Sequence, residues 1–339
     1  MRTFLLSLAA LLAAAAIGWL AWWLVAARHD ASTLEAWREA RVAEGWQAEW
    51  RARRLGGFPE RVELHLIEPA LADPKTGWAW QAPALVRVRD RLAAFTDAPL
   101  RIVFPPDHSV STPGTRVEIT AETLEARLWR TGPARQLVRA VLDLSGLVAL
   151  STADWQVAVG EGRFAARALE DAPQILALSL ELRRIVPPAR VIGVLERAGR
   201  GGTVIEEAAG QVRVTFDRPW DARALDDRRP QPERITVERL ALTWGALELT
   251  VAGVLEVDAA GRPEGQLVVR VTRWRDWLAA AEASGALPGA LRAALETALE
   301  GVSQMQMHPR ELDVPLRFDA GRIRLGPVPI APAPVLRLP

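Results

Sequence analysis

The sequence predicts a mainly β chain, of the β-rich α+β class, that follows one membrane-spanning helix. Residues 4–27 form an apolar run that only Ser7 and Gly18 interrupt. Beyond this run, short segments alternate apolar and polar residues with a period of two, as half-buried strands do. Helical periodicity recurs in only a few short segments. We therefore expect an extended curved antiparallel sheet or two β lobes, with a few amphipathic helices.

The apolar run is long enough to be a membrane anchor. As a helix it would extend about 36 Å at about 1.5 Å per residue, which is sufficient to cross a bilayer. It is longer than the apolar core of a cleavable signal peptide, and it ends in Trp19, Trp22 and Trp23, residues typical of a membrane interface. Residues 1–27 are therefore predicted to be an uncleaved transmembrane anchor. Because no second span follows, we expect a single-pass inner-membrane protein whose main domain lies in the periplasm.

The residues after the anchor predict a short stalk and a first β-rich lobe. Residues 28–45 favour a helical stalk that Ser32 caps and Gly45 ends. The first lobe is expected over residues 46–198, where Val62, Leu64 and Leu66 alternate with polar residues. Its other expected strands cover residues 46–55, 80–88, 101–104, 116–120, 123–129, 141–147, 155–159, 163–169 and 175–182.

A boundary is predicted where a short helix over residues 191–197 gives way to a glycine-rich stretch. Residues 199–339 then form a second β-rich lobe with two helices and a proline-rich tail that begins at Pro327. Its strands are expected at residues 212–216, 235–237, 240–244, 247–257, 267–271, 312–318 and 322–325. The helices are expected at residues 274–283 and 288–299, the latter with Leu291, Leu295 and Leu299 on one stripe.

Composition argues against several classes of function. The 42 basic and 41 acidic residues leave a formal charge of +1, so no nucleic-acid partner is expected. The lack of cysteine excludes disulfides, thiolate metal sites and a cysteine nucleophile. Four scattered histidines lack the spacing of a helical metal site. Of these, His65 is expected to face outward from its strand, and His108 lies beside Asp107 in a turn.

No catalytic motif is present in the sequence. The glycine-rich residues 199–203 lack the lysine and the strand-helix context of a phosphate-binding loop. The aspartates of residues 217–227 alternate with arginines and do not follow the spacing of a calcium-binding loop. A hydrolase that uses scattered carboxylates is the remaining enzymatic hypothesis, and no motif supports it. We therefore predict no enzyme, no catalytic residue, no metal and no cofactor.

Tryptophan is the residue type that most suggests a binding surface, because the chain contains 14. Indole suits a lipid or protein interface, and it equally suits ordinary core packing. Trp78 and Trp80 share one face of a predicted strand, and Trp274 and Trp277 are spaced as on one side of a helix. These four residues are the candidate ligand-binding residues.

Several short motifs resemble a known bacterial family. They are Gly45-Trp46, Gly57-Phe58-Pro59 with Arg61, Pro69, Asp73-Pro74, Gly77-Trp78, Trp80 and Ala82-Pro83, followed by Leu242, Trp244-Gly245, Gly253, Asp258, Gly261, Gly265 and residues 326–334. Together they resemble domain of unknown function 2125, over nearly everything after the anchor. The anchor followed by strand-rich sequence is also similar, more loosely, to AsmA-like envelope proteins, a resemblance that implies lipid handling.

Two hypotheses of function follow. In the first, an apolar sheet face binds or shuttles lipid at the cell envelope, because burial of acyl chain is favourable. In the second, the protein is a structural scaffold of an envelope complex and has no lipid ligand; its proline-rich tail, loops or sheet edges would then bind another envelope protein. An open apolar groove would favour the first hypothesis, and a closed core with an exposed tail would favour the second.

Overall fold

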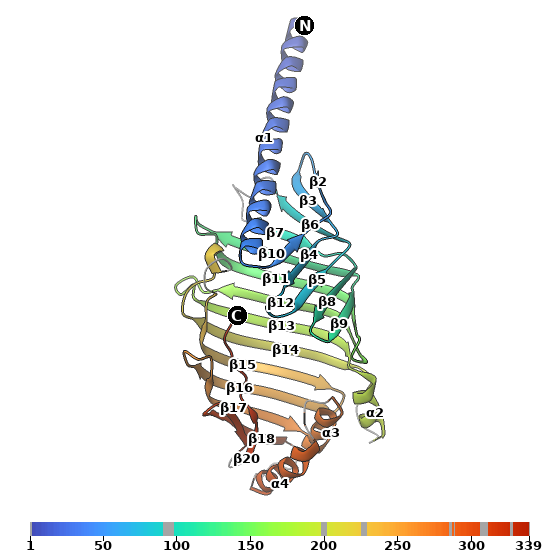
Figure 1. Cartoon of the computed structure of the whole chain (residues 1–339), viewed down its shortest axis with the longest axis vertical. Helices are drawn as coiled ribbons and strands as arrows, with labels where there is room; N and C mark the ends of the chain where they lie inside the picture. Colours follow the sequence, from blue (N-terminus) through green and yellow to red (C-terminus); the bar gives the residue numbers. More distant parts are fainter. Residues whose placement is uncertain are drawn as a thin grey trace. The chain divides into compact units, whose positions relative to one another are not determined.

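The chain forms two compact units that are both rich in antiparallel strands. The computed structural model describes residues 2–90, 98–197, 202–224, 229–284, 287, 289–305, 311–325 and 328–338. Unit 1 comprises Met1–Ile119 and Leu124–Trp129, and unit 2 comprises Thr120–Thr123 and Arg130–Pro339. The predicted β-rich class with few helices is confirmed (Figure 1). The expected boundary between residues 198 and 199 lies outside the described residues, and the strands that flank it both belong to unit 2.

Unit 1 combines one long helix with two antiparallel ladders. The first ladder has the strand order β2-β3-β6-β7-β10, and the second has the order β1-β4-β5-β8. The elements are α1 (Arg2–Ala43), β1 (Gln47–Glu49), β2 (Ala52–Gly56), β3 (Arg61–Ile67), β4 (Ala70–Asp73), β5 (Trp78–Gln81), β6 (Ala84–Asp90), β7 (Leu100–Val103), β8 (Asp107–Thr112), β9 (Thr115–Thr120) and β10 (Thr123–Thr131). The predicted alternation in β3 is confirmed, because Val62, Leu64 and Leu66 are buried.

Three local predictions for unit 1 were wrong. The strand predicted over residues 80–88 is two strands, because β5 pairs with β4 and β8 whereas β6 pairs with β3 and β7. Ser32 does not begin a separate stalk helix, because α1 is continuous and the Ser32 hydroxyl donates to the His29 carbonyl oxygen at 2.9 Å. No glycine or proline between residues 19 and 43 interrupts the helix. The strand predicted over residues 46–55 is two strands, because β1 pairs with β4 whereas β2 pairs with β3. Gly45 ends α1 as predicted and has a φ of +92°.

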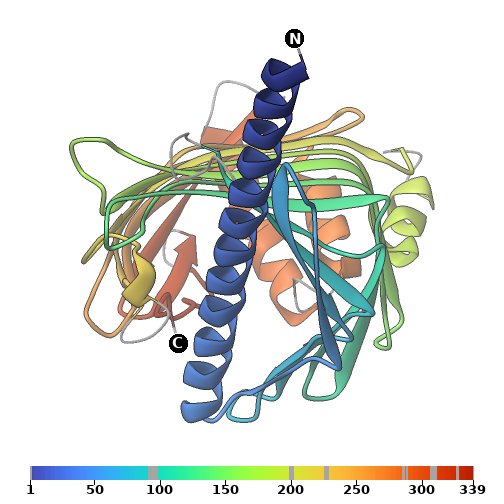
Figure 2. The ribbon, with the colours of Figure 1, turned by 90° about the horizontal axis from the view of Figure 1, so that it is seen from above.

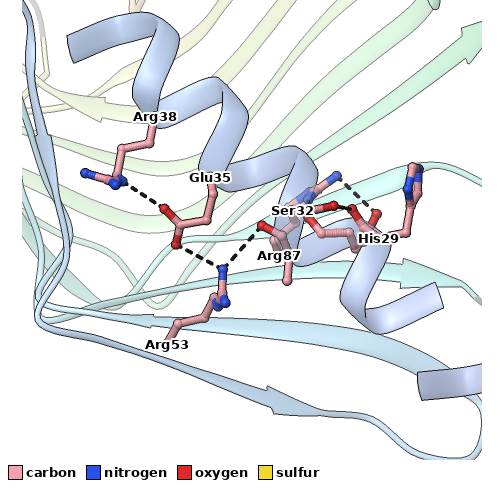
Figure 3. Close-up of polar contacts among 8 residues, drawn as sticks. His29, Ser32, Glu35, Arg38, Arg53 and Arg87 are labelled. Carbon is pink, nitrogen blue, oxygen red and sulfur yellow. Dashed lines mark hydrogen bonds and ion pairs between the residues drawn. The ribbon is translucent and has the colours of Figure 1, made fainter. Parts of the chain in front are cut away.

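Ion pairs and hydrogen bonds hold the second half of α1 against the strands of unit 1. Asp30 is almost fully buried, and its Oδ1 accepts a hydrogen bond from Arg89 Nη1 at 2.8 Å. Arg87 donates to the Asp30 carbonyl oxygen at 3.3 Å, and Arg53 bridges Glu35 and the Ala31 carbonyl oxygen (Figure 3). Arg87 also lies 3.6 Å from Asp30 Oδ1, so two arginines compensate the buried carboxylate charge. The helix is therefore fixed to the strands by charge as well as by apolar contact.

The exposure of α1 changes along its length. Trp23 and Ala27 are buried against Val62 of β3. In contrast, Ile17 and Val25 are 68% and 65% exposed. The N-terminal part of α1 extends beyond the strands of unit 1 (Figure 1). Among the residues that the structure describes, no helix has the combined length and hydropathy of a membrane span.

Unit 2 is a meander in which each strand pairs with the next one. The antiparallel order β11 to β20 follows the sequence. The elements are β11 (Gln136–Ser151), β12 (Trp155–Ala168), β13 (Ile175–Val186), α2 (Ala189–Arg197), β14 (Ile205–Phe216), the 3-10 turn η2 (Ala222–Ala224), β15 (Pro232–Trp244), β16 (Leu247–Val257), β17 (Pro263–Thr272), α3 (Trp274–Ser284), α4 (Gly289–Met305), β18 (Glu311–Asp319), β19 (Arg322–Leu325) and β20 (Val328–Pro332).

Most elements predicted for unit 2 are confirmed, with two corrections. The strands expected at residues 235–237 and 240–244 are one strand, β15, which continues through a β-bulge between Val237 and Leu240. Residues 155–169 were expected to form two strands, whereas β12 is continuous through Gly160 and Gly162. It continues because β11 and β13 pair with it on both sides. Gly162 is also needed there, since a Cβ at this position would lie 2.8 Å from a methyl carbon of Leu182. The predicted helices correspond to α2, α3 and α4, and Pro288 lies outside the described residues.

The helices cover only one part of the unit 2 sheet. Leu295 and Leu299 of α4 pack with Trp274 of α3 against Val271, Leu312 and Val314. Viewed from above, the strands arch over α3 and α4 (Figure 2). A second cluster contains Val191 of α2 and Ala280 of α3 together with Ile205, Trp244 and Leu247. A third cluster, which contains Leu176, Val214 and Phe216, includes no described residue of these helices, so only part of the core of unit 2 lies beneath them.

Replacing Leu247 should destabilise unit 2, because this side chain is 1% exposed within the second cluster. We expect Leu247→Ala to lower the free energy of unfolding by about 2–5 kcal/mol. Leu150→Ala is the matched control, since Leu150 is 53% exposed, and it should change stability by less than about 0.5 kcal/mol. Urea unfolding followed by tryptophan fluorescence measures both values. Equal effects of the two substitutions would contradict this description of the core.

Candidate functional site

One face of the unit 2 sheet carries an apolar row that crosses six strands. Residues directly opposite each other in an antiparallel pair project from the same face. The strand registers therefore place side chains from β11 to β16 in one line. This line, here named the open row, consists of Leu142, Phe164, Leu180, Gly210, Leu240 and Val251.

The open row is only partly covered by other residues. Phe164 is 40% exposed, and Leu142, Leu180, Leu240 and Val251 are half-buried. Among the described residues, none of these side chains belongs to the buried clusters that contain α2, α3 or α4. A sheet face with an ordinary core would bury such residues. The middle of this face therefore presents apolar surface to its surroundings.

At two of its borders, the open row continues into apolar surface that other residues cover. Beyond Val251 the register continues to Val269 and Val314, which pack beneath the helices. Toward another edge, Leu338 packs on a cluster that contains Leu176 and Phe216. An apolar molecule bound on the open row would therefore also lie beside these apolar residues.

A β-bulge keeps the apolar residues of β15 on one face. Val237 is opposite Gly253 and Leu240 is opposite Val251, so β15 contains one residue more than β16 over this stretch. Without the extra residue, positions 237 and 240 would project from opposite faces, because side chains alternate along a strand. Glu238 lies at this bulge, and its Oε1 accepts a hydrogen bond from Arg213 at 2.6 Å.

Gly210 provides space in the open row for a neighbouring leucine. A Cβ at this position would lie 2.6 Å from a methyl carbon of Leu240, which is closer than such contacts occur. The backbone of Gly210 does not have a positive φ. Its role is therefore steric, and the Leu240 side chain lies over the glycine instead of being displaced.

The opposite face of the sheet is polar and paired. Cross-strand ion pairs join Arg163 to Asp143 at 2.6 Å and Arg270 to Asp313 at 2.7 Å and 2.9 Å. The guanidinium of Arg270 lowers the pKa of Asp313 below its ordinary value of 3.8. A pocket of about 420 Å³ on this part of the sheet is lined by residues of both charges, including Glu248 and Arg239. The two faces thus differ sharply in polarity.

Trp78 and Trp80 each contact other aromatic rings of unit 1. Trp78 contacts Trp46 edge to face, with ring centroids 6.3 Å apart. Trp80 contacts Phe104 in the same manner at 6.2 Å and lies 6.4 Å from the ring of His108. Both indoles are half-buried. The pair shares a strand face, as expected, and other aromatic rings occupy much of its surroundings.

Trp274 and Trp277 lie in the helical core of unit 2. Trp274 is 7% exposed, and the guanidinium carbon of Arg275 lies 4.2 Å from its ring centroid. Trp277 packs against Trp244, with ring centroids 6.5 Å apart. The structure therefore brings these two tryptophans together in unit 2, whereas Trp78 and Trp80 belong to unit 1. None of the four lies in the open row.

The open row was missed by sequence reasoning although the strands that contain five of its six residues were predicted. The alternation of Leu176, Leu178, Leu180 and Leu182 predicts that these residues share a face. It does not show which part of that face other elements cover. Leu176 is buried and Leu178 packs beside it, whereas Leu180 lies in the open row. Strand register and coverage are needed to separate them.

The histidines of the described residues do not form a metal centre. His65 bonds to Glu63 at 2.9 Å, and its side chain is 41% exposed, in agreement with the predicted outward orientation. Burial lowers the pKa of His108, although the Pro105 carbonyl and Asp107 oppose this shift. No group of three potential metal ligands occurs among the described residues. His308 and the aspartates at 226 and 227 lie outside them.

Comparison with known proteins establishes the family of the chain. The family described as "Uncharacterized protein conserved in bacteria (DUF2125)" matches residues 23–334. The chain belongs to this family, as its Gly57-Phe58-Pro59 segment and the other motifs predicted. No curated protein and no solved structure matches the chain. The looser similarity to AsmA-like proteins therefore stays a prediction.

The Arg270–Asp313 pair predicts a pH-dependent coupling on the polar face. A carboxylate whose pKa is lowered on folding stabilises the protein above its unfolded pKa, and this contribution is lost as pH falls through the folded pKa. A double-mutant cycle with Arg270→Gln and Asp313→Asn should therefore give a favourable coupling at pH 7. The coupling should disappear when the pH falls below the lowered pKa of Asp313. Urea unfolding at both pH values measures it, and a pH-independent coupling would contradict the assignment.

Proposed function

We propose that this member of an uncharacterised bacterial family is anchored in the inner membrane by α1 and binds lipid acyl chains along the open row of unit 2. The observation that carries the proposal is the open row itself, a continuous apolar line that other side chains only partly cover. The main domain lies in the periplasm. The role is binding or transfer of lipid, without a catalytic residue.

Sequence and exposure together support the anchor. Residues 4–27 are almost entirely apolar, and α1 extends over them without a break. Ile17, Leu20 and Val25 are exposed, whereas Trp23 and Ala27 face β3. Residues 4–22 precede the buried segment and would extend roughly 28 Å as a helix, close to the thickness of a bilayer core. Trp19 and Trp22 then lie where an interfacial aromatic belt is expected.

The shape and chemistry of the open row favour an acyl chain as its ligand. From β11 to β16 the row spans five strand spacings, or roughly 24 Å at about 4.8 Å each. Its side chains are leucine, phenylalanine and valine with one glycine, so they offer no hydrogen bond to a polar ligand. A linear apolar molecule can lie across the strands, and each methylene buried there contributes about 0.8 kcal/mol.

The C-terminal tail supports lipid binding over the scaffold hypothesis. Leu338 exchanges two hydrogen bonds with the Gln231 side chain, and Leu336 N donates to the Gly261 carbonyl oxygen at 2.7 Å. Residues 333–338 therefore bind to the loops of their own unit. Pro327 and Pro339 lie outside the described residues. A proline-rich tail held in this way is less available to another protein.

Photocrosslinking of the full-length protein in bacterial membranes tests the ligand and its position together. Cells are supplied with a fatty acid that carries a diazirine, and the crosslinked peptides are identified by mass spectrometry. Adducts on β12, β13 or β15 would support the open row as the site. Adducts confined to α1 would reflect only bulk membrane and would contradict it. A protein without lipid adducts on unit 2 would contradict the proposal and favour the scaffold hypothesis instead.

A polar substitution in the open row should reduce lipid retention. Leu180→Gln places an amide among apolar side chains, so native mass spectrometry of the gently purified protein should show loss of the lipid bound to unit 2. Ser179→Gln is the matched control, because Ser179 precedes Leu180 in β13 and is exposed on the opposite face of the sheet. Lipid should be retained by the control at the level of the unmodified protein. Equal retention by both variants would argue against the open row.

A further inference from the structure

The turn between β2 and β3 exposes two large apolar side chains beside α1. Leu55 is 44% exposed and Phe58 is 50% exposed. They flank Gly56 and Gly57, and a Cβ on Gly57 would lie 2.7 Å from the Arg61 carbonyl oxygen. The turn is therefore tight, with a φ of +87° at Gly57. Residues 55–59 are here named the hairpin tip.

The hairpin tip is attached to α1 at a defined position. The indole nitrogen of Trp23 donates a hydrogen bond to the Arg61 carbonyl oxygen at 2.8 Å. The rings of Trp23 and Phe58 meet edge to face, with centroids 5.6 Å apart. In Figure 1 the β2–β3 hairpin extends along α1 toward the N-terminus of the helix. Phe58 is thus fixed at the level of Trp23.

This level coincides with the exposed tryptophans of the helix. Trp22 and Trp19 precede Trp23 by one and four residues, which corresponds to roughly 6 Å along the axis at most. Their rings stack with centroids 6.1 Å apart, and they are 38% and 40% exposed. Exposed aromatic and aliphatic side chains from two elements therefore gather at one height along α1.

We propose that the hairpin tip is a second membrane contact, in which Leu55 and Phe58 enter the interface of the bilayer leaflet from which α1 emerges. The inference rests on the proposed anchoring by α1. Its occupant is the boundary between headgroups and acyl chains, because the tip continues the apolar surface of the helix. Two contacts instead of one would fix the orientation of unit 1 on the membrane.

The charges around the hairpin tip predict which lipids are sufficient for the tip to enter a bilayer. Arg54 and Glu60 are both exposed on either side of the apolar residues, and their charges are opposite. Electrostatic attraction to anionic lipid is therefore not required, and apolar burial carries the contact. The tip should enter a bilayer of phosphatidylcholine alone.

The absence of cysteine from the chain permits a direct test by site-specific labelling. Leu55→Cys and Phe58→Cys are labelled with an environment-sensitive fluorophore in the full-length protein and inserted into phosphatidylcholine nanodiscs. Lys75→Cys in the exposed β4–β5 turn of unit 1 is the water-facing control, and Ile17→Cys reports the helix in the bilayer. Nitroxide-labelled phosphatidylcholine then quenches fluorophores that lie in the membrane.

We expect blue-shifted emission and strong quenching at positions 17, 55 and 58, and little quenching at 75. If 55 and 58 behave like 75 while 17 is quenched, the hairpin contact is wrong and the anchor stands. If 17 is not quenched, the proposed anchoring fails and the hairpin contact fails with it. Using two tip positions guards against a local effect of replacing Phe58, whose ring contacts Trp23.

Discussion

Backbone pairing between neighbouring antiparallel strands is the constraint on which the other features of unit 2 depend. Because each strand pairs with the next one, a single register decides which side chains share a face across the whole sheet. A slip of one residue between β13 and β14 would move Gln211 to the apolar face and Val212 to the polar face. The difference in polarity between the faces thus strongly specifies the register, and the register in turn creates the open row.

A β-bulge and two glycines keep the apolar side chains on one face of the sheet at positions where a regular strand would not. The bulge at Glu238 absorbs a shift in the apolar pattern of β15, and the Arg213–Glu238 pair holds the bulge on the polar face. Gly162 and Gly210 remove side chains where leucines of adjacent strands need space. In each case the energetic cost of a weaker strand residue is offset by pairing on both sides.

The open row and the hairpin tip share a physical rationale. Both are exposed apolar surfaces that are accompanied by polar contacts. The open row lies on the sheet face opposite the cross-strand ion pairs. The hydrogen bond from the Trp23 indole to the Arg61 carbonyl oxygen holds the tip. Exposed apolar surface of this kind marks contact with another molecule. The proposed function would account for both, since one surface would lie at the bilayer and the other would shelter a chain taken from it.

The sequence by itself determined the β-rich class, the positions of most strands, the helices α2 to α4 and the family, because these depend on local periodicity and short motifs. It also predicted the end of α1, since Gly45 readily adopts a positive φ. Tertiary structure alone decided that β12 is one strand, that Ser32 lies inside a helix, and that Trp274 and Trp277 pack in the core. It also separated Leu180 from Leu176, although both follow the same alternation. The physical reason is that exposure depends on which distant elements cover a face, and pairing partners far apart in the sequence decide that coverage.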